Sequence, residues 1–218
     1  FIKENQDKVV IFACGTSIDN LLNYGITPDF YAIAERGKDI LIQARETSKL
    51  YNTKNTYFVG STSIFPGVSK LFKDAIFFFR PGLSCSPLFA EQEQIALAPD
   101  PLAANAGLSI GLHLGFKDFY LCGVDMGSEY KTHGHAPGGW YDRHDVDPYK
   151  NFSLPARGNF GGTIWTMPEL EWSRQSMENL ISISPARTYS NLGTGALIKG
   201  ATPRHWKTIN FASPQQPK

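Results

Sequence analysis

The sequence lacks an excess of charge, a long apolar segment and any paired cysteine motif. Its 218 residues include 21 Lys and Arg against 20 Asp and Glu, so no global field attracts nucleic acid or an anionic membrane surface. No apolar run approaches the ~20 residues that cross a bilayer. We therefore expect neither nucleic acid nor a membrane as a partner. Cys14, Cys85 and Cys122 lie far apart without a C-x-x-C motif, which predicts small buried thiols and a cytoplasmic location.

The signatures of several well-known chemistries are also missing. There is no G-x-x-x-x-G-K-S/T phosphate loop, and no G-x-G-x-x-G follows a predicted strand, which argues against both nucleotide-binding motifs. Residues 107–111 match G-x-S-x-G, but they lie inside a predicted helix and not at the sharp turn of a nucleophile elbow. His133-Gly134-His135 lacks a third ligand at fixed spacing, and Asp145-Val146-Asp147 lies in a polar loop. We therefore predict no bound metal and no cofactor.

Short strands alternate with helical segments along most of the chain. Hydrophobic residues make up 42% of the sequence, which is enough for a buried core. Strands are predicted at residues 8–14, 30–34, 57–59, 75–79, 118–123 and 188–191, most of them apolar runs typical of strands covered on both faces. Helices are predicted at residues 17–22, 37–50, 66–72, 102–114 and 168–183. This alternation predicts an α/β fold with a mainly parallel sheet and helices on both faces.

The alternation stops after Asp125 and returns near residue 168. The stretch 127–167 holds three of the five His and two of the four Trp, and this content favours a functional lid over a disordered insert. We therefore divide the chain into three parts. These are an α/β core of residues 1–126 plus 164–210, a lid of residues 127–163 and a tail of residues 211–218.

Small polar residues follow three of the predicted strands, as Gly15-Thr16-Ser17, residues 60–63 and Gly123-Val124-Asp125. Ligands of open parallel sheets bind outside the carboxyl ends of the strands. The first of these loops leads directly into a helix, whose free N–H groups and dipole favour a phosphate. Ordinary helix capping explains the same residues, so both interpretations stay open at this point.

A second candidate lies in the helix predicted from residue 102. Asn105 can donate and accept hydrogen bonds, and Gly107 lets a ligand approach the backbone. Close packing of this helix on the sheet is the alternative, because Gly107 and Gly111 are also suited to it.

Four segments of the sequence together resemble one protein family. The longest, residues 101–125, is similar to the core of the motility-associated-factor (Maf) flagellin glycosyltransferases, and its L-G-F-K-x-F-Y-L-x-G-V-D pattern resembles bacterial CMP-sialic-acid-dependent sialyltransferases. Residues 14–30, 159–166 and 189–200 match further family segments in the same order. The resemblance spans about residues 8–203. A related group is the 6-hydroxymethylpterin diphosphokinase-like family.

The resemblance implies a sialyltransferase-like, Rossmann-like α/β core with a long lid loop. It also implies transfer of a nonulosonic acid of the pseudaminic, legionaminic or sialic type from a CMP-sugar to Ser or Thr of flagellin. The implied reaction inverts configuration and needs no metal, and its partners are the nucleotide-sugar donor and flagellin as acceptor. The family's earlier strand ending in G-x-G-P-S-L has no counterpart in this sequence, so we expect a catalytic-domain fragment that lacks one wall of its site.

The expected site residues lie in the strand-end loops, in the helix predicted from residue 102 and in the lid. The nucleotide-binding set comprises Cys14, Gly15, Thr16, Ser17, Asn105, Ala106, Gly107, Gly123, Tyr130 and Tyr141. The transfer also needs a base for the acceptor hydroxyl, and a histidine suits this role because its ordinary pKa of ~6.5 lies close to working pH. We predict His135 first and His133 second as this base, with Asp125 orienting it or binding ribose. No motif places the family's catalytic histidine in this sequence.

Two other functions stay open from the sequence. An ATP-dependent 6-hydroxymethylpterin diphosphokinase needs Mg held by carboxylates, which gives weight to Asp125, Asp145 and Asp147. A non-catalytic module that binds flagellin or glycan through the aromatic lid is the second. Binding of CMP, tested against adenine and pterin ligands, separates the three functions.

Overall fold

The computed structural model describes residues 1–83, 86–131, 137–146 and 151–211. Its first sheet has four parallel strands in the order β1–β2–β3–β4. The strands are β1 (Phe12–Cys14), β2 (Phe30–Ile33), β3 (Tyr57–Ser61) and β4 (Ala75–Phe78). The helices are α1 (Ile2–Asn5), α2 (Ser17–Asn23), α3 (Lys38–Leu50), α4 (Ser86–Phe89), α5 (Ala103–His113), α6 (Trp140–Arg143) and α7 (Pro168–Ser182).

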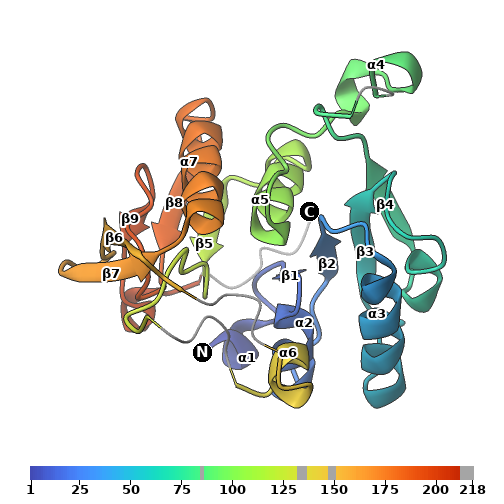
Figure 1. Cartoon of the computed structure of the whole chain (residues 1–218), viewed down its shortest axis with the longest axis horizontal. Helices are drawn as coiled ribbons and strands as arrows, with labels where there is room; N and C mark the ends of the chain where they lie inside the picture. Colours follow the sequence, from blue (N-terminus) through green and yellow to red (C-terminus); the bar gives the residue numbers. More distant parts are fainter. Residues whose placement is uncertain (84–85, 132–136, 147–150, 212–218) are drawn as a thin grey trace, which may run out of the picture.

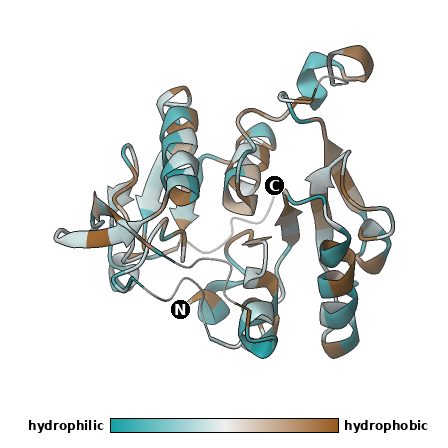
Figure 2. Ribbon diagram, in the orientation of Figure 1, coloured by the Kyte–Doolittle hydropathy of each residue, from teal (hydrophilic) through white to brown (hydrophobic). Residues whose placement is uncertain are grey.

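Alternate side chains of this sheet point into two separate cores, because successive residues of a strand face opposite sides. Tyr31 and Ile33 of β2 pack with residues of α2 and α3. Ala32, between them in the chain, packs on the other face with Ala106 and Ile110 of α5. Helix α3 is amphipathic and shows alternating polar and apolar bands in Figure 2. The predicted α/β fold, with a parallel sheet and helices on both faces, is confirmed.

A second parallel sheet lies on the other side of α5 (Figure 1). Its strands are β5 (Asp118–Leu121), β8 (Thr188–Asn191) and β9 (Thr202–Pro203), in that order. The two sheets share α5, since Ala106 and Ile110 face the first sheet while Leu108 packs with Met177 of α7. Helix α5 is therefore buried on two sides, which explains why its sequence is apolar nearly all round.

The insert after β5 contains regular structure that the sequence did not predict. It includes α6 and an antiparallel hairpin of β6 (Leu154–Arg157) and β7 (Thr163–Thr166). The hairpin turns through Gly161 and Gly162, whose φ angles of 99° and 73° favour glycine. Pro155 lies within β6, and a proline weakens the sequence signal of a strand.

Two predicted elements are shorter than expected. Strand β1 begins only at Phe12. The Ile11 N–H donates a hydrogen bond to a carboxylate oxygen of Asp29 at 2.8 Å and not to a carbonyl of a neighbouring strand. Residues 66–72 were predicted to be helical, but only the 3-10 turn η1 (Ser69–Leu71) forms there. The other 3-10 turns are η2 (Gln92–Gln94) and η3 (Trp206–Thr208). None of the described helices has the length and apolarity that a bilayer crossing requires.

Candidate functional site

A cavity of about 500 Å³ opens where β1, β2 and β5 end. The loops that follow β1 and β5 line it, together with residues of α3, α6 and the loop after β8. The carboxyl ends of parallel strands meet at one edge of a sheet, which is where ligands of such folds bind. Eight of the predicted site residues line this cavity, namely Cys14, Gly15, Thr16, Ser17, Gly123, Asp125, Tyr130 and Tyr141.

The loop after β1 is held by a local turn. The Ser17 hydroxyl accepts a hydrogen bond from the Cys14 N–H at 2.8 Å and donates one to the Cys14 carbonyl at 2.9 Å. The Ser17 hydroxyl therefore closes the turn between β1 and α2 and accepts no hydrogen bond from an N–H group of the helix. Burial, with a smaller contribution from Glu35, raises the pKa of the Cys14 thiol to about 12, so this thiol stays protonated and is a poor nucleophile. Thr16 lines the cavity, and its side chain caps nothing in α2.

Asp125 follows β5 and lies against the glycine-rich loop after β8. Its Oδ1 accepts a hydrogen bond from the Gly195 N–H at 3.2 Å. A Cβ atom on Gly195 would lie 2.0 Å from the backbone oxygen of Asp125, so only glycine permits this approach. Burial raises the pKa of Asp125, and backbone hydrogen bonds from Gly195 and Thr194 partly oppose the rise. The site thus holds a half-buried carboxyl group in a fixed place.

Two tyrosines of the insert also reach the cavity. Burial, followed by the charge of Glu35, raises the pKa of Tyr141, although a hydrogen bond with the Gln43 side chain lowers it. The Tyr141 hydroxyl is therefore a neutral hydrogen-bond donor at neutral pH. Tyr130 lines the same cavity and is 69% exposed, which places its ring at the solvent edge.

Carboxylates dominate the charge of the described lining. Glu35, Asp125 and Glu129 line the cavity, and none of its described lining residues is Lys or Arg. Within the described part of the chain, no three His, Cys, Asp or Glu side chains gather as a site for a metal ion. The described lining thus offers hydrogen-bond acceptors, which suit a ligand rich in hydroxyl groups.

Asn105, Ala106 and Gly107 were also predicted to bind the nucleotide, but they do not line the cavity. Asn105 and Ala106 are fully buried, and the Asn105 amide donates to the Ser173 carbonyl of α7 at 2.9 Å. A Cβ atom on Gly107 would lie 2.6 Å from the Cys14 sulfur. These residues pack α5 against β1 and α7, which is the alternative that the sequence left open. Helix α5 reaches the cavity only at its start, through Ala103 and Ala104.

The predicted bases His133 and His135 lie outside the described residues, as does Asp147. Their assignment stays a prediction. Asp145 is described but does not line the cavity, and neither does His144, whose Nε2 lies 3.2 Å from a carboxylate oxygen of Glu46.

The sequence did not point to Glu35, Gln43 or Thr194, which also line the cavity. Glu35 comes shortly after the end of β2, so the rule that ligands bind at strand ends could have found it. The Gly193-Thr194-Gly195 run after the last predicted strand carried a similar signal. Gln43 lies in the middle of α3 and is only 6% exposed, and no local pattern marks it.

Comparison with known proteins gives one family and one solved structure. The sequence model of the family described as 6-hydroxymethylpterin diphosphokinase MptE-like matches residues 1–131. The structure of the Maf glycosyltransferase from Magnetospirillum magneticum AMB-1 is similar with a TM-score of 0.84 and 31% sequence identity. That similarity covers 97% of this chain and 32% of the Magnetospirillum chain, so the chain spans about a third of that protein. No curated protein matches the sequence.

These two findings agree with the resemblance drawn from the four sequence segments. The likeness to the Maf structure extends over nearly the whole chain. The family match covers the first sheet, α5, β5 and Asp125, which supply most of the cavity lining. Because it covers more than half of the chain, the chain belongs to the 6-hydroxymethylpterin diphosphokinase MptE-like family.

Proposed function

We propose that the chain binds a CMP-linked nonulosonic acid in this cavity and transfers the sugar to a Ser or Thr hydroxyl of flagellin. One observation carries the proposal. Thr16, Asp125 and Tyr141 line the same cavity, although they come from three separate parts of the chain. The likeness to a Maf glycosyltransferase supports the same reaction class. Flagellin as the acceptor and the cytoplasm as the compartment are part of the proposal.

The chemistry of the lining fits a nucleotide sugar. The neutral hydroxyl groups of Thr16 and Tyr141 are donors for a phosphate, which has only acceptor oxygens when ionised. The carboxylates of Glu35 and Asp125 are acceptors for the hydroxyl groups of ribose and of the sugar. A ligand that combines a phosphate with many hydroxyl groups therefore uses both kinds of group in the lining.

The proposed reaction is a displacement at the anomeric carbon of the sugar. The acceptor oxygen forms a bond to this carbon while the bond from the carbon to the CMP phosphate oxygen breaks. Negative charge grows on the departing phosphate, and preorganised donors such as the Tyr141 hydroxyl stabilise it most in the transition state. The acceptor proton passes to a base, for which His135 and then His133 are our candidates, and Asp125 orients that base or binds ribose.

Diphosphate transfer from ATP to a hydroxymethylpterin is the second candidate, because the family description names that activity. This reaction needs Mg²⁺, which proteins hold with carboxylates. The described carboxylates do not converge on a shared metal site, so they do not fit a resident ion and we derive no step through one. The glycosyl transfer is the better supported function because its structural likeness extends over 97% of the chain.

A thermal-shift screen with CMP, ATP and 6-hydroxymethylpterin, with and without EDTA, tests the proposal. We expect saturable stabilisation by CMP that EDTA leaves unchanged. The variant Thr16→Val should weaken CMP binding about tenfold, because a hydrogen bond to a charged group is lost. Thr62→Val is the matched control, since Thr62 follows β3 in an exposed loop outside the cavity. Stabilisation by ATP and the pterin alone, abolished by EDTA, would establish the second candidate instead.

A transfer assay separates an enzyme from a binding module. The chain is incubated with flagellin and a CMP-nonulosonate, and the mass of flagellin is followed. The proposal predicts an increase by one sugar residue at Ser or Thr, while CMP binding without any mass change would show a non-catalytic module.

A further inference from the structure

The α6 segment, residues 137–146, lies against α2 and α3 without a hydrophobic core of its own. Helix α6 is a single turn with no buried residue, and such a short helix is unstable in isolation. In Figure 1 it lies beside α2, although more than 100 residues separate the two helices in the sequence. Contacts with the rest of the chain must therefore determine its position.

Two carboxylates on neighbouring helices supply these contacts. Asp19 of α2 is only 1% exposed. Its Oδ1 accepts a hydrogen bond from the Thr47 hydroxyl at 2.7 Å, and its Oδ2 accepts one from Arg143 Nη2 at 3.1 Å. A buried carboxylate is costly without a partner of opposite charge, and Arg143 provides that charge across 124 residues of sequence.

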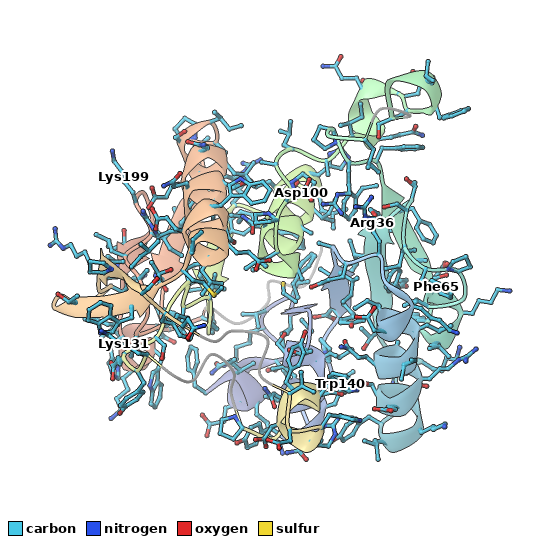
Figure 3. The ribbon with its side chains drawn as sticks, in the orientation of Figure 1. Arg36, Phe65, Asp100, Lys131, Trp140 and Lys199 are labelled. Atoms are coloured by element: carbon cyan, nitrogen blue, oxygen red, sulfur yellow. The ribbon has the colours of Figure 1, made fainter. Side chains whose placement is uncertain are left out.

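The second carboxylate is that of Glu46 on α3. Its Oε2 accepts a hydrogen bond from the Trp140 indole N–H at 2.8 Å and lies 3.2 Å from His144 Nε2. The two rings stack, with centroids 4.2 Å apart. Trp140 and His144 lie one helical turn apart and therefore contact the same carboxylate from the same face of α6. Figure 3 shows the side chain of Trp140 on α6.

Tyr141 lies between these anchor residues in the sequence and reaches the cavity. Its neighbour Trp140 is fixed by Glu46, and Arg143 is fixed by Asp19 two residues further on. Arg143 also donates a hydrogen bond to the Gly138 carbonyl at 3.1 Å, and Asp142 accepts one from the Gly138 N–H at 2.8 Å. These two bonds connect the start of the segment to its helix. Tyr141 also forms a hydrogen bond with the Gln43 side chain, so its own contact acts together with the anchors on either side of it.

We propose that Arg143 and Trp140 are positioning residues, which hold the Tyr141 hydroxyl toward the nucleotide phosphate through the carboxylates of Asp19 and Glu46. This inference rests on the proposed function, since it assigns how one donor of that site is held. Neither Arg143 nor Trp140 lines the cavity, so both act on the ligand through Tyr141.

A double-mutant cycle with CMP as the probe tests the inference. Calorimetry measures the CMP affinity of the wild-type chain, Tyr141→Phe, Arg143→Ala and the double variant. Each single variant should bind CMP about tenfold more weakly, because each removes the same hydrogen bond to the phosphate. The double variant should bind no more weakly than either single variant, because residues that act through one contact are not additive.

Three further variants separate positioning from a general loss of structure. Arg143→Lys keeps a charge for Asp19 and should recover part of the affinity, whereas Trp140→Phe should lower it several-fold. Arg45→Ala is the matched control, because Arg45 is exposed on α3 next to Glu46 and makes no side-chain contact in the described part of the chain. The melting temperature of each variant shows whether the chain stays folded.

The outcomes distinguish this inference from the proposed function. CMP binding by the wild-type chain, with fully additive losses in the double variant, would overturn the positioning role alone. A tenfold loss in Tyr141→Phe with no loss in Arg143→Ala or in Asp19→Asn would overturn it as well. Absence of CMP binding by the wild-type chain would overturn the proposed function together with this inference.

Discussion

The cavity has two walls that the chain builds in different ways. The first wall consists of Asp125 and the loop of residues 193–195, where glycine lets two backbones approach closely and the Asp125 side chain accepts a hydrogen bond from the Gly195 N–H at 3.2 Å. The second is the α6 segment, whose helix Trp140–Arg143 has no buried residue and depends on Arg143 and Trp140. One wall is thus part of the packed core, while polar side chains hold the other in place.

This difference predicts how changes at the two walls act. Close backbone packing is shared with the folding of the second sheet, so a change there reduces the free energy of unfolding. The contacts of Glu46 are half-exposed and contribute little to that free energy, whereas loss of Arg143 would leave the buried Asp19 carboxylate without its charge partner. Changes at the first wall should therefore lower stability, and changes at Glu46 in the second wall should lower ligand affinity at nearly constant stability.

The largest expected effect is that of Gly195→Ala. The added Cβ would lie 2.0 Å from the backbone oxygen of Asp125, and backbone atoms cannot move aside as a side chain does. We expect the free energy of unfolding to fall by about 3 kcal/mol, the upper range for overpacking. Urea unfolding measures this change. Gly82→Ala is the control, since nothing lies within 4 Å of its Cβ position, and it should change stability by less than about 0.5 kcal/mol. Equal stability of the two variants would show that the first wall is not tightly packed.

A smaller effect is expected for Asp125→Asn, and it depends on pH. Burial raises the pKa of Asp125 above its ordinary value of 3.8, so the folded state binds this proton more readily than the unfolded state does. The carboxyl group therefore favours folding most below that value, and its contribution is lost as pH rises through the folded pKa. Asn has no such dependence. We expect wild type to lose stability relative to Asp125→Asn as pH rises above 3.8.

Urea unfolding at several pH values follows this difference. The opposite trend, in which the wild type gains stability over Asp125→Asn as pH rises, would mean that ionised Asp125 is stabilised in the folded state.

The smallest expected change in stability is that of Glu46→Ala at the second wall. It removes the partner of Trp140 and His144, but half-exposed contacts of this kind contribute less than about 1 kcal/mol. CMP affinity, measured by calorimetry, should nevertheless fall two- to threefold if Glu46 anchors the segment that carries Tyr141. Unchanged CMP affinity would show that Glu46 does not help to position Tyr141, and that Asp19 alone does so.

Much of the fold was predictable because its signals are local. The apolar runs at β2, β4 and β5 and the amphipathic pattern of α3 specify strands and helices over a few residues. The hairpin of β6 and β7 was missed, since Pro155 interrupts one strand and both are only four residues long. The separation of the strands into two sheets around α5 is a long-range property that no local pattern records.

Site residues could be predicted from the sequence only where they directly follow a strand. Gly15, Thr16 and Asp125 follow strands, and the parallel topology brings them to one cavity. Gly107 shows the limit, because a glycine that permits close helix packing and one that admits a ligand have the same sequence signal. The anchoring of α6 depends on the pairing of Arg143 with Asp19, 124 residues away, which a single sequence does not reveal.

A crystal structure of the chain grown with saturating CMP tests the central claim most directly. The account predicts the nucleotide in the cavity between Thr16, Asp125 and Tyr141, with a phosphate oxygen within hydrogen-bond distance of the Tyr141 hydroxyl. A second cavity, lined by Arg157, Arg174 and Lys199 among others, provides an internal comparison. Nucleotide bound there, or no nucleotide at either place at saturating concentration, would contradict the account.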